Sequence, residues 1–153
     1  MKKILMVGLI SSLFSVSVFA AACTATATTS AQAGPVGSTG TAPVTGEQCI
    51  CDGGTAFKNT VHGGSGQVVN TPIFVKNGFD VQCSNNTIVS FDEVSSNAFA
   101  VESGSRKGNQ SFIGSSNGGS VTTSVKCTGA NSACTAADVT TAHTAAVAAA
   151  TSS

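Results

Sequence analysis

The chain has 153 residues, of which only 9% are charged, and its seven basic residues balance its seven acidic ones. Soluble domains usually carry about 25% charged residues, so this surface is unusually neutral. The chain has no basic run, which argues against nucleic-acid binding and against a polybasic membrane-binding face. Trp and Tyr are absent, which argues against sugar or ligand sites built on these rings and leaves no small-molecule substrate evident.

Residues 1–22 show the three-part pattern of a secretory signal peptide. Two lysines precede an apolar run over 4–19, and small alanines follow it, which predicts cleavage after Ala20 or Ala22. The run is shorter than the roughly 20 residues that span a bilayer, and no stop-transfer charges follow it. A signal this short and led by lysine is typical of bacteria. The sequence therefore predicts export, and removal of this segment leaves five basic and seven acidic residues, a net charge of −2.

Cleavage after Ala22 would make Cys23 the first residue, which is the position of the lipidated cysteine in bacterial lipoproteins. Those signals usually carry a larger aliphatic residue three positions before the cysteine, whereas this chain has Ala20. We therefore expect membrane attachment only if Cys23 is lipidated. Otherwise Cys23 has two options, pairing within its own chain or pairing with a neighbouring subunit.

The chain contains six cysteines, an even number that predicts up to three disulfides in an exported protein. Structural zinc sites space paired cysteines by two to four residues. Here the close pairs are separated by one and by six residues. We therefore expect disulfides and assign no metal and no cofactor. The candidates are Cys23, Cys49, Cys51, Cys83, Cys127 and Cys134.

Two pairings can be narrowed from the spacing. Cys127 and Cys134 enclose a short polar loop, which predicts a local disulfide. In an extended segment Cys49 and Cys51 would point to the same face, because side chains in a strand alternate with period two. They would then reach two partners on one side of a sheet, and Cys83, at the end of a predicted strand, is a candidate for one of them.

Residues 23–46 resemble an arm more than a folded domain. Alternating Ala and Thr are followed by a stretch of Gly, Pro, Ser and Thr, and such a segment cannot bury enough surface to order itself alone. Two interpretations remain open. The arm is either an idle linker or a strand donated to another subunit, which is a known way of building fibres.

Residues 47–135 carry the strand signals, with β-branched and apolar runs separated by turn residues every 8 to 12 positions. This pattern predicts an all-β fold, a single small β-sandwich or barrel-like domain of about seven short strands. An extended N-terminal arm and an Ala-rich C-terminal tail or short helix would flank it. The predicted strands are 55–61, 67–75, 79–83, 87–92, 97–102, 110–113 and 120–127.

The strongest turn signal is Asn77-Gly78, which fits a two-residue type I′ hairpin between 72–76 and 79–83. In that register Phe74 would face Val81 and Val75 would face Asp80. Further turns are expected at 84–86 and 115–120. We expect the six phenylalanines after residue 22 to lie in the core. The two faces predicted by alternation are Phe74, Phe79, Val81 and Cys83, and Val121, Thr123, Val125 and Cys127.

Residues 136–153 are rich in alanine, which favours helix. Val139, His143 and Val147 are four residues apart and would share one helical face. The frequent Val and Thr residues are equally compatible with an extended tail. In either form the segment is a second candidate for an assembly arm.

A hydrolase-like pattern occurs at 114–118, where Gly-Ser-Ser-Asn-Gly matches GxSxG. Ser116 would be the nucleophile and His62 or His143 the base. That motif needs a strand, a sharp turn and a helix in an α/β sheet, and here it lies in a Gly/Ser-rich turn. We therefore assign no catalytic residue and expect no enzyme. Two interpretations apply to Asp92 and Glu93, which either bind calcium between strand ends or lie in a solvated turn. We prefer the solvated turn.

The order of segments, an arm followed by a neutral, disulfide-containing β-domain, is similar to that of secreted bacterial fibre subunits. The similarity is one of type and rests on no specific motif. We therefore predict a structural protein that is secreted or held at the cell surface and forms a homopolymer. It would be the subunit of an extracellular fibre, pilus-like filament or coat that assembles by strand addition, with disulfides as an optional lock. The alternative is a monomeric secreted binding module or adhesin.

Overall fold

The computed structural model describes residues 23, 46–61, 74–75 and 79–152. The described strands form two open antiparallel sheets and no closed barrel, and one helix follows them, which confirms the expected small all-β domain with a C-terminal helix. The larger sheet has the order β1-β4-β5-β6-β7, and the smaller one pairs β2 with β3. The elements are β1 (Gln48–Asp52), β2 (Phe57–Val61), β3 (Phe79–Cys83), β4 (Thr87–Glu93), β5 (Phe99–Ser105), β6 (Gln110–Ser115), β7 (Thr122–Lys126), the short 3-10 helix η1 (Ala130–Ser132) and α1 (Ala136–Thr151).

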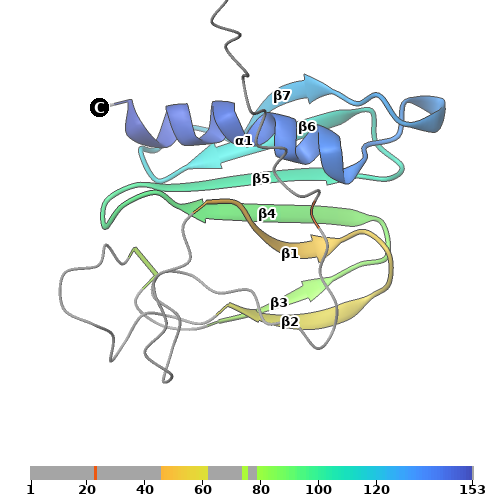
Figure 1. Ribbon diagram of the computed structural model, residues 1–153, viewed down its shortest axis with the longest axis horizontal. Helices are drawn as coiled ribbons and strands as arrows, with labels where there is room; N and C mark the ends of the chain where they lie inside the picture. Colours follow the sequence, from red (N-terminus) through yellow and green to blue (C-terminus); the bar gives the residue numbers. More distant parts are fainter. Residues whose placement is uncertain (1–22, 24–45, 62–73, 76–78, 153) are drawn as a thin grey trace, which may run out of the picture.

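The elements stack in three layers (Figure 1). Helix α1 lies against one face of the five-stranded sheet and contacts β4 through β7. Strands β2 and β3 lie beyond the opposite face, near β1. Because side chains alternate along a strand, each strand of the central sheet sends half of its residues toward α1 and half away from it.

Strands β4 to β7 follow one another as antiparallel neighbours joined by short turns. The two seven-residue strands β4 and β5 pair along their whole length, from Thr87 opposite Ser105 to Glu93 opposite Phe99. The expected turns at 84–86 and 115–120 are confirmed. In the second turn Gly118 has a φ of 86°, a left-handed conformation that glycine adopts without steric cost.

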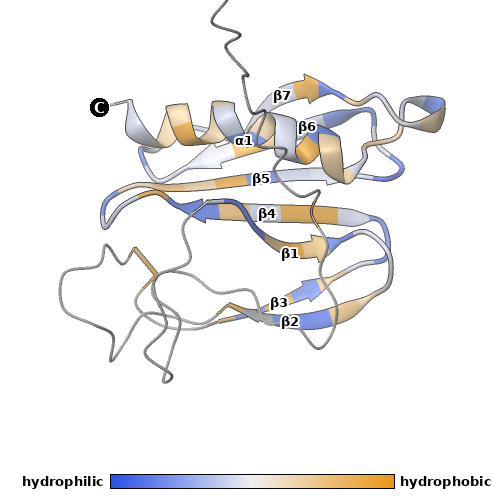
Figure 2. Ribbon diagram, viewed as in Figure 1, coloured by the Kyte–Doolittle hydropathy of each residue, from blue (hydrophilic) through white to orange (hydrophobic). Residues whose placement is uncertain are grey.

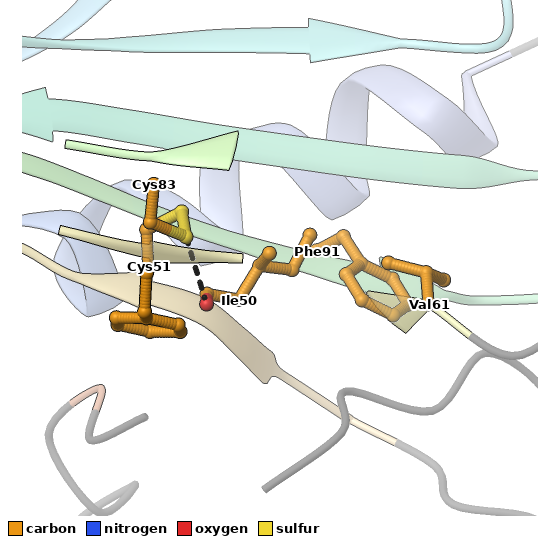
Figure 3. Packing of buried hydrophobic residues seen from close by; sticks show 6 residues of the cluster. Ile50, Cys51, Val61, Cys83 and Phe91 are labelled. Atoms are coloured by element: carbon orange, nitrogen blue, oxygen red, sulfur yellow. Dashed lines mark hydrogen bonds between the residues drawn. A yellow bond between two sulfur atoms is a disulfide. The ribbon is translucent and has the colours of Figure 1, made fainter. Parts of the chain in front are cut away.

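The main core lies between the two sheets. Phe91 of β4 packs with Ile50 and Cys51 of β1 and with Val61 of β2, and all four are buried (Figure 3). Phe99 stacks on Phe91, with ring centroids 5.3 Å apart. Figure 2 marks hydrophobic residues along β4 and β5, between the covering layers. Burying one such side chain stabilises a domain by about 1.5–3 kcal/mol, so this cluster is what holds the small sheet against the large one.

The predicted hairpin between 72–76 and 79–83 is wrong, because β3 pairs with β2 instead. Val81 lies opposite Asn59 and Asp80 opposite Thr60. The described residues Phe74 and Val75 form no strand. Their backbone N–H groups donate to the Glu93 carboxylate, and the Phe74 ring stacks on Phe99, 5.1 Å between centroids. The Asn77-Gly78 turn lies outside the described residues.

Two phenylalanines expected in the core are largely exposed, Phe79 at 47% and Phe112 at 41%. Along β3 burial increases from Phe79 through half-buried Val81, which packs against the core between the sheets, to buried Cys83. The face predicted for β7 shows the same gradient, from Val121, which is 70% exposed, to buried Cys127. Alternation therefore predicted which residues share a face, but burial varies along that face.

A β-bulge in β1 corrects the expected geometry of the first cysteine pair. Cys49 lies opposite Ser90 and Cys51 opposite Val89, with the register shifted between them. Since Ser90 and Val89 are consecutive on β4, their partners point to opposite faces of the sheet. Cys49 and Cys51 therefore do not share a face, as an unbulged strand would require. Strand β1 itself was not among the predicted runs.

All six cysteines are paired within the chain, as Cys23–Cys49, Cys51–Cys83 and Cys127–Cys134. The local 127–134 pairing and Cys83 as a partner of the 49–51 pair are confirmed. Cys23 bonds inside its own subunit, so its sulfur is free neither for a lipid nor for a neighbouring subunit. Disulfides persist in oxidising compartments, and this framework therefore indicates an environment outside the reducing cytosol.

The Cys23–Cys49 bond also changes the interpretation of the N-terminal arm. It attaches Cys23 to β1, and the chain re-enters the described domain at Gly46, immediately before the same strand. The intervening 24–45 segment is thus covalently attached at both ends. A donated strand with a free end is not available from this segment.

Helix α1 confirms the helical interpretation of the Ala-rich segment. Thr135 caps it through a capping box with Asp138, in which each side chain bonds the other's backbone N–H. Its buried face is made of small residues, Val139, Ala142, Ala146 and Ala150, which pack on the sheet. Because α1 is docked on its own domain, it is not a free assembly arm. No helix among the described residues is long and apolar enough to cross a membrane.

Removing the Cys51–Cys83 bond by a double change to alanine should destabilise the fold more than removing Cys127–Cys134. The first bond spans 32 residues and the second spans 7, and in the chain-entropy account the losses are about 3–4 and about 2.5 kcal/mol respectively. Chemical denaturation of the two double variants, followed by circular dichroism, measures this difference. A larger loss from the short loop would contradict the account.

Candidate functional site

Six polar side chains meet between α1 and the central sheet, in a region otherwise expected to be apolar. Two of them, Ser90 on β4 and Glu102 on β5, have no solvent exposure at all. Charged groups are rarely buried unless they are paired, so this set is the first place to look for chemistry. We call it the polar cluster, and its members are Glu47, Ser90, Asp92, Glu102, Thr140 and His143.

His143 is held between two carboxylates. Its Nδ1 lies 3.2 Å from Glu102 Oε1 and its Nε2 lies 3.4 Å from Asp92 Oδ2. The bonds to Asp92 and Glu102 raise the pKa of His143 to about 10, against the opposing effect of burial. The imidazole is therefore protonated at neutral pH, and both ring nitrogens donate. Since one partner is on β4 and the other on β5, His143 fixes α1 across two strands.

The hydroxyl groups of the cluster bond Glu102 and a third carboxylate, Glu47. Ser90 Oγ lies 2.7 Å from Glu47 Oε1 and 2.9 Å from Glu102 Oε1, and Thr140 Oγ1 donates to Glu47 at 3.1 Å. A hydroxyl has one hydrogen, so Ser90 donates to one carboxylate at a time. The Oε2 atoms of Glu47 and Glu102 are buried and have no hydrogen-bond partner among the described residues.

Serine, histidine and acid occur together in the polar cluster, but their arrangement differs from a nucleophilic triad. In a triad the base bonds the nucleophile, and the acid orients the base. Here both nitrogens of His143 face carboxylates, and Ser90 also bonds carboxylates and is completely buried. The geometry supports a structural role, in which the cluster attaches the helix to the sheet.

Among the described residues, the GxSxG serine is not brought together with a histidine. Ser116 lies in the turn after β6, where its hydroxyl accepts from the Phe99 N–H at 2.9 Å and donates to the Asn97 carbonyl at 3.2 Å. These bonds attach this turn to the start of β5. His143 is bonded within the polar cluster, and His62 lies outside the described residues.

The proposed calcium pair is also separated. Asp92 and Glu93 are consecutive on β4 and point to opposite faces, since Asp92 faces His143 while Glu93 accepts the N–H groups of Phe74 and Val75. The solvated-turn interpretation is wrong as well, because both carboxylates are buried. Within the described ranges no group of three or more His, Cys, Asp or Glu residues is arranged to hold a metal ion.

A separate carboxylate, Asp138, stabilises the beginning of α1. Burial acts to raise its pKa, but hydrogen bonds from Thr128 and Thr135 outweigh burial and lower the pKa below the usual 3.8. Its two oxygens accept the hydroxyl and backbone N–H of Thr128 and of Thr135. Asp138 thereby joins the Cys127–Cys134 loop to the helix.

The opposite face of the central sheet carries an apolar groove of about 400 Å³. The core under β2 and β3 takes residues from β1 to β5 but none from β6 or β7, so the second half of the sheet has no covering layer among the described residues. We call this hollow the apolar groove. Its main apolar side chains are Phe74, Phe99, Val101, Phe112 and Val121.

Two features make the apolar groove a candidate contact surface. Phe112 and Val121 are among the most exposed large hydrophobic residues of the described chain. Gly114, next but one to Phe112 on β6, has no side chain to fill the space between them. None of the described residues that line the groove is charged. Exposed apolar surface that is concentrated in this way often marks a binding site.

Sequence reasoning found His143 and Asp92 but missed the connection between them and the other cluster members. Glu47, Ser90, Glu102 and Thr140 come from four separate segments, and no local motif links them. One signal was present: Ser90, Asp92 and Glu102 are polar residues within otherwise apolar strand runs, and Ser90 and Asp92 alternate on β4.

Comparison with protein-family models, curated proteins and solved structures gave no match for this chain.

Changing His143 to glutamine should reduce the free energy of unfolding at pH 7 by about 1.5–3 kcal/mol, the usual range for hydrogen bonds to charged groups. The folded pKa is about 10 and the ordinary value 6.5. The contribution of His143 is therefore fully present below pH 6.5 and is lost as the pH rises toward 10. Denaturation of both proteins at several pH values tests this. A stability gap that stays constant from pH 6 to 9.5 would contradict the assignment.

Proposed function

We propose that this protein is an exported structural subunit whose copies associate through the apolar groove. The assembly would be an extracellular fibre, pilus-like filament or surface coat. The observation that carries the proposal is the half of the central sheet that no described element covers, where Phe112 and Val121 are exposed and the described lining is uncharged. A second copy of the chain is the occupant we expect.

Export is supported by two independent features. The three disulfides require an oxidising compartment. The sequence pattern of residues 1–22 predicts a signal peptide.

The low charge supports association with copies of itself. Only 9% of the chain is charged, so little electrostatic repulsion keeps two copies apart. Full burial of a Val or Phe side chain contributes about 1.5–3 kcal/mol. Phe112 is 41% and Val121 70% exposed, so two copies that cover each other's groove would gain the corresponding part of this contribution from both sides.

The assembly that we propose is noncovalent and does not use the N-terminal segment as a free strand. Every cysteine is paired within the subunit, so no thiol remains for a disulfide between subunits. The 24–45 segment is attached at both ends through Cys23–Cys49 and β1. The proposal therefore uses a contact surface on the described part of the folded domain.

The apolar groove also favours one alternative, a monomeric secreted binding module. Its volume of about 400 Å³ falls within the range of about 300–1,000 Å³ that is typical of small-molecule sites. In that case the groove would hold an apolar ligand and the protein would remain a monomer. The two functions make opposite predictions about mass in solution.

A double change of Phe112 and Val121 to serine should abolish self-association or weaken it at least tenfold, because tenfold corresponds to about 1.4 kcal/mol. The wild-type protein, purified with its disulfides intact, should increase in mean mass as its concentration rises. Sedimentation velocity over a wide concentration range measures both.

The matched control is Phe79→Ser, which removes an equally exposed phenylalanine on β3, away from the apolar groove. This variant should associate like the wild type. A wild-type protein that remains monomeric at all concentrations and salt conditions would contradict the structural proposal. A screen for apolar ligands bound by the wild type but not by the double variant would then test the binding module.

A further inference from the structure

The turn between β6 and β7 is joined to the C-terminal end of α1 by one side chain. Asn117 Nδ2 donates to the Ser152 carbonyl at 2.7 Å and to the Ala149 carbonyl at 3.2 Å. The last carbonyl groups of a helix have no partner within the helix, and α1 has no basic residue in its last turn. The amide of Asn117 therefore attaches this end of the helix to the sheet through hydrogen bonds.

The residue that follows Asn117 makes its amide chemically reactive. Gly118 is exposed and has a φ of 86°, and apart from its chain neighbours no atom lies within 4 Å of the place where a Cβ would stand. Its N–H donates to no other residue in the described part of the chain. A backbone nitrogen that is exposed, unhindered and not hydrogen-bonded can attack the side-chain amide that precedes it.

Two other exposed asparagines lack this arrangement. The N–H that follows Asn97 and the N–H that follows Asn131 each donate to a backbone carbonyl, at 3.3 Å and 2.9 Å respectively. These N–H groups belong to an alanine and a serine, whose side chains hinder attack by the nitrogen. Exposure is common to all three asparagines, so the unhindered nitrogen after Asn117 is what distinguishes it.

We propose that Asn117 is a deamidation site and that its conversion releases the end of α1 from the sheet. The Gly118 nitrogen attacks Asn117 Cγ, the new N–C bond closes a cyclic imide, and Nδ2 leaves as ammonia with the proton of the Gly118 N–H. Water then opens the ring by adding its OH to one carbonyl carbon and its proton to the ring nitrogen. This step leaves aspartate or isoaspartate at position 117. Water is the only co-reactant, and the inference does not rest on the proposed function.

Either product reverses the interaction at the end of α1. An amide donates through its nitrogen, whereas a carboxylate only accepts. The C-terminal end of a helix carries partial negative charge, so it repels a carboxylate. His143 and Asp138 still hold the rest of the helix. We therefore expect the last turn of α1 to detach more often while the remainder of the helix stays docked.

The hydrogen bonds of Asn117 also control the rate of the reaction. Ring closure expels Nδ2, so the bonds from Nδ2 to the helix carbonyls must break first. The reaction therefore waits for the last turn of α1 to open, and afterwards the same bonds cannot form again. The modification is irreversible, and its extent depends on how often this end of the helix opens.

Peptide mapping by mass spectrometry tests the site in the exported chain with its disulfides intact, incubated in warm, mildly alkaline buffer. Asn117 should convert about tenfold faster than Asn97 or Asn131, because the attacking nitrogen at those sites is hydrogen-bonded and hindered. The same chain, reduced and unfolded in urea, should convert Asn117 faster still. Equal rates at the three sites in the folded chain would overturn the deamidation site. An Asn117 rate that unfolding leaves unchanged would overturn the control by the helix.

Two variants test the release of α1. Asn117→Asp reproduces one product, and Asn117→Ala is the matched control that removes the donor without adding charge. Amide hydrogen exchange at pH 7 should be about tenfold faster in the last turn of α1 for Asn117→Asp than for the wild type. The increase should be smaller for Asn117→Ala, and the first turn should not change in either variant. Wild-type exchange at the last turn of Asn117→Asp would overturn the release, and equal increases in both variants would overturn the repulsion.

Discussion

The five-stranded sheet has two faces, and the described elements cover only one and a half of them. Helix α1 extends across β4 to β7 on one side, while the two-stranded sheet protects the part of the other side near β1 and β4. A strand buries only as many residues as its neighbouring layers cover, which explains why Phe91 is buried and Phe112 is not. The apolar groove and its exposed residues follow from this incomplete coverage.

The covered side depends on a charged contact more than on apolar area. The residues of α1 that face the sheet are mostly alanines, which bury little surface each. His143 compensates by bonding Glu102 and Asp92 on two strands, and Asp138 fixes the first turn to the Cys127–Cys134 loop. Such pairs specify one position of the helix, because a shifted helix would leave buried carboxylates unpaired. The helix is therefore held in place, and the other face of the sheet remains the surface on which assembly can act.

Much of the fold could be predicted from local signals, and the site could not. Six of the seven described strands overlap predicted runs, and the Ala-rich helix and the 127–134 disulfide were expected. The bulge at Cys49 and Cys51 is set by pairing with β4, which no local pattern encodes. Asn77-Gly78 suggested a hairpin, yet β3 pairs with β2, because strand choice depends on which partner completes the core. The polar cluster joins residues up to 96 positions apart, from Glu47 to His143, and the groove exists only once the layers are known.

The central claim is that the half of the sheet that no described element covers is where copies of this protein meet. Residue-resolved amide hydrogen exchange, compared between dilute and concentrated wild-type protein, tests it most directly. The account predicts that amides of β6 and β7, which border the apolar groove, become protected as concentration rises, while the exchange of β1 amides stays the same. Protection that appears at β1 or β3 and leaves β7 unchanged would contradict it, as would an exchange pattern independent of concentration.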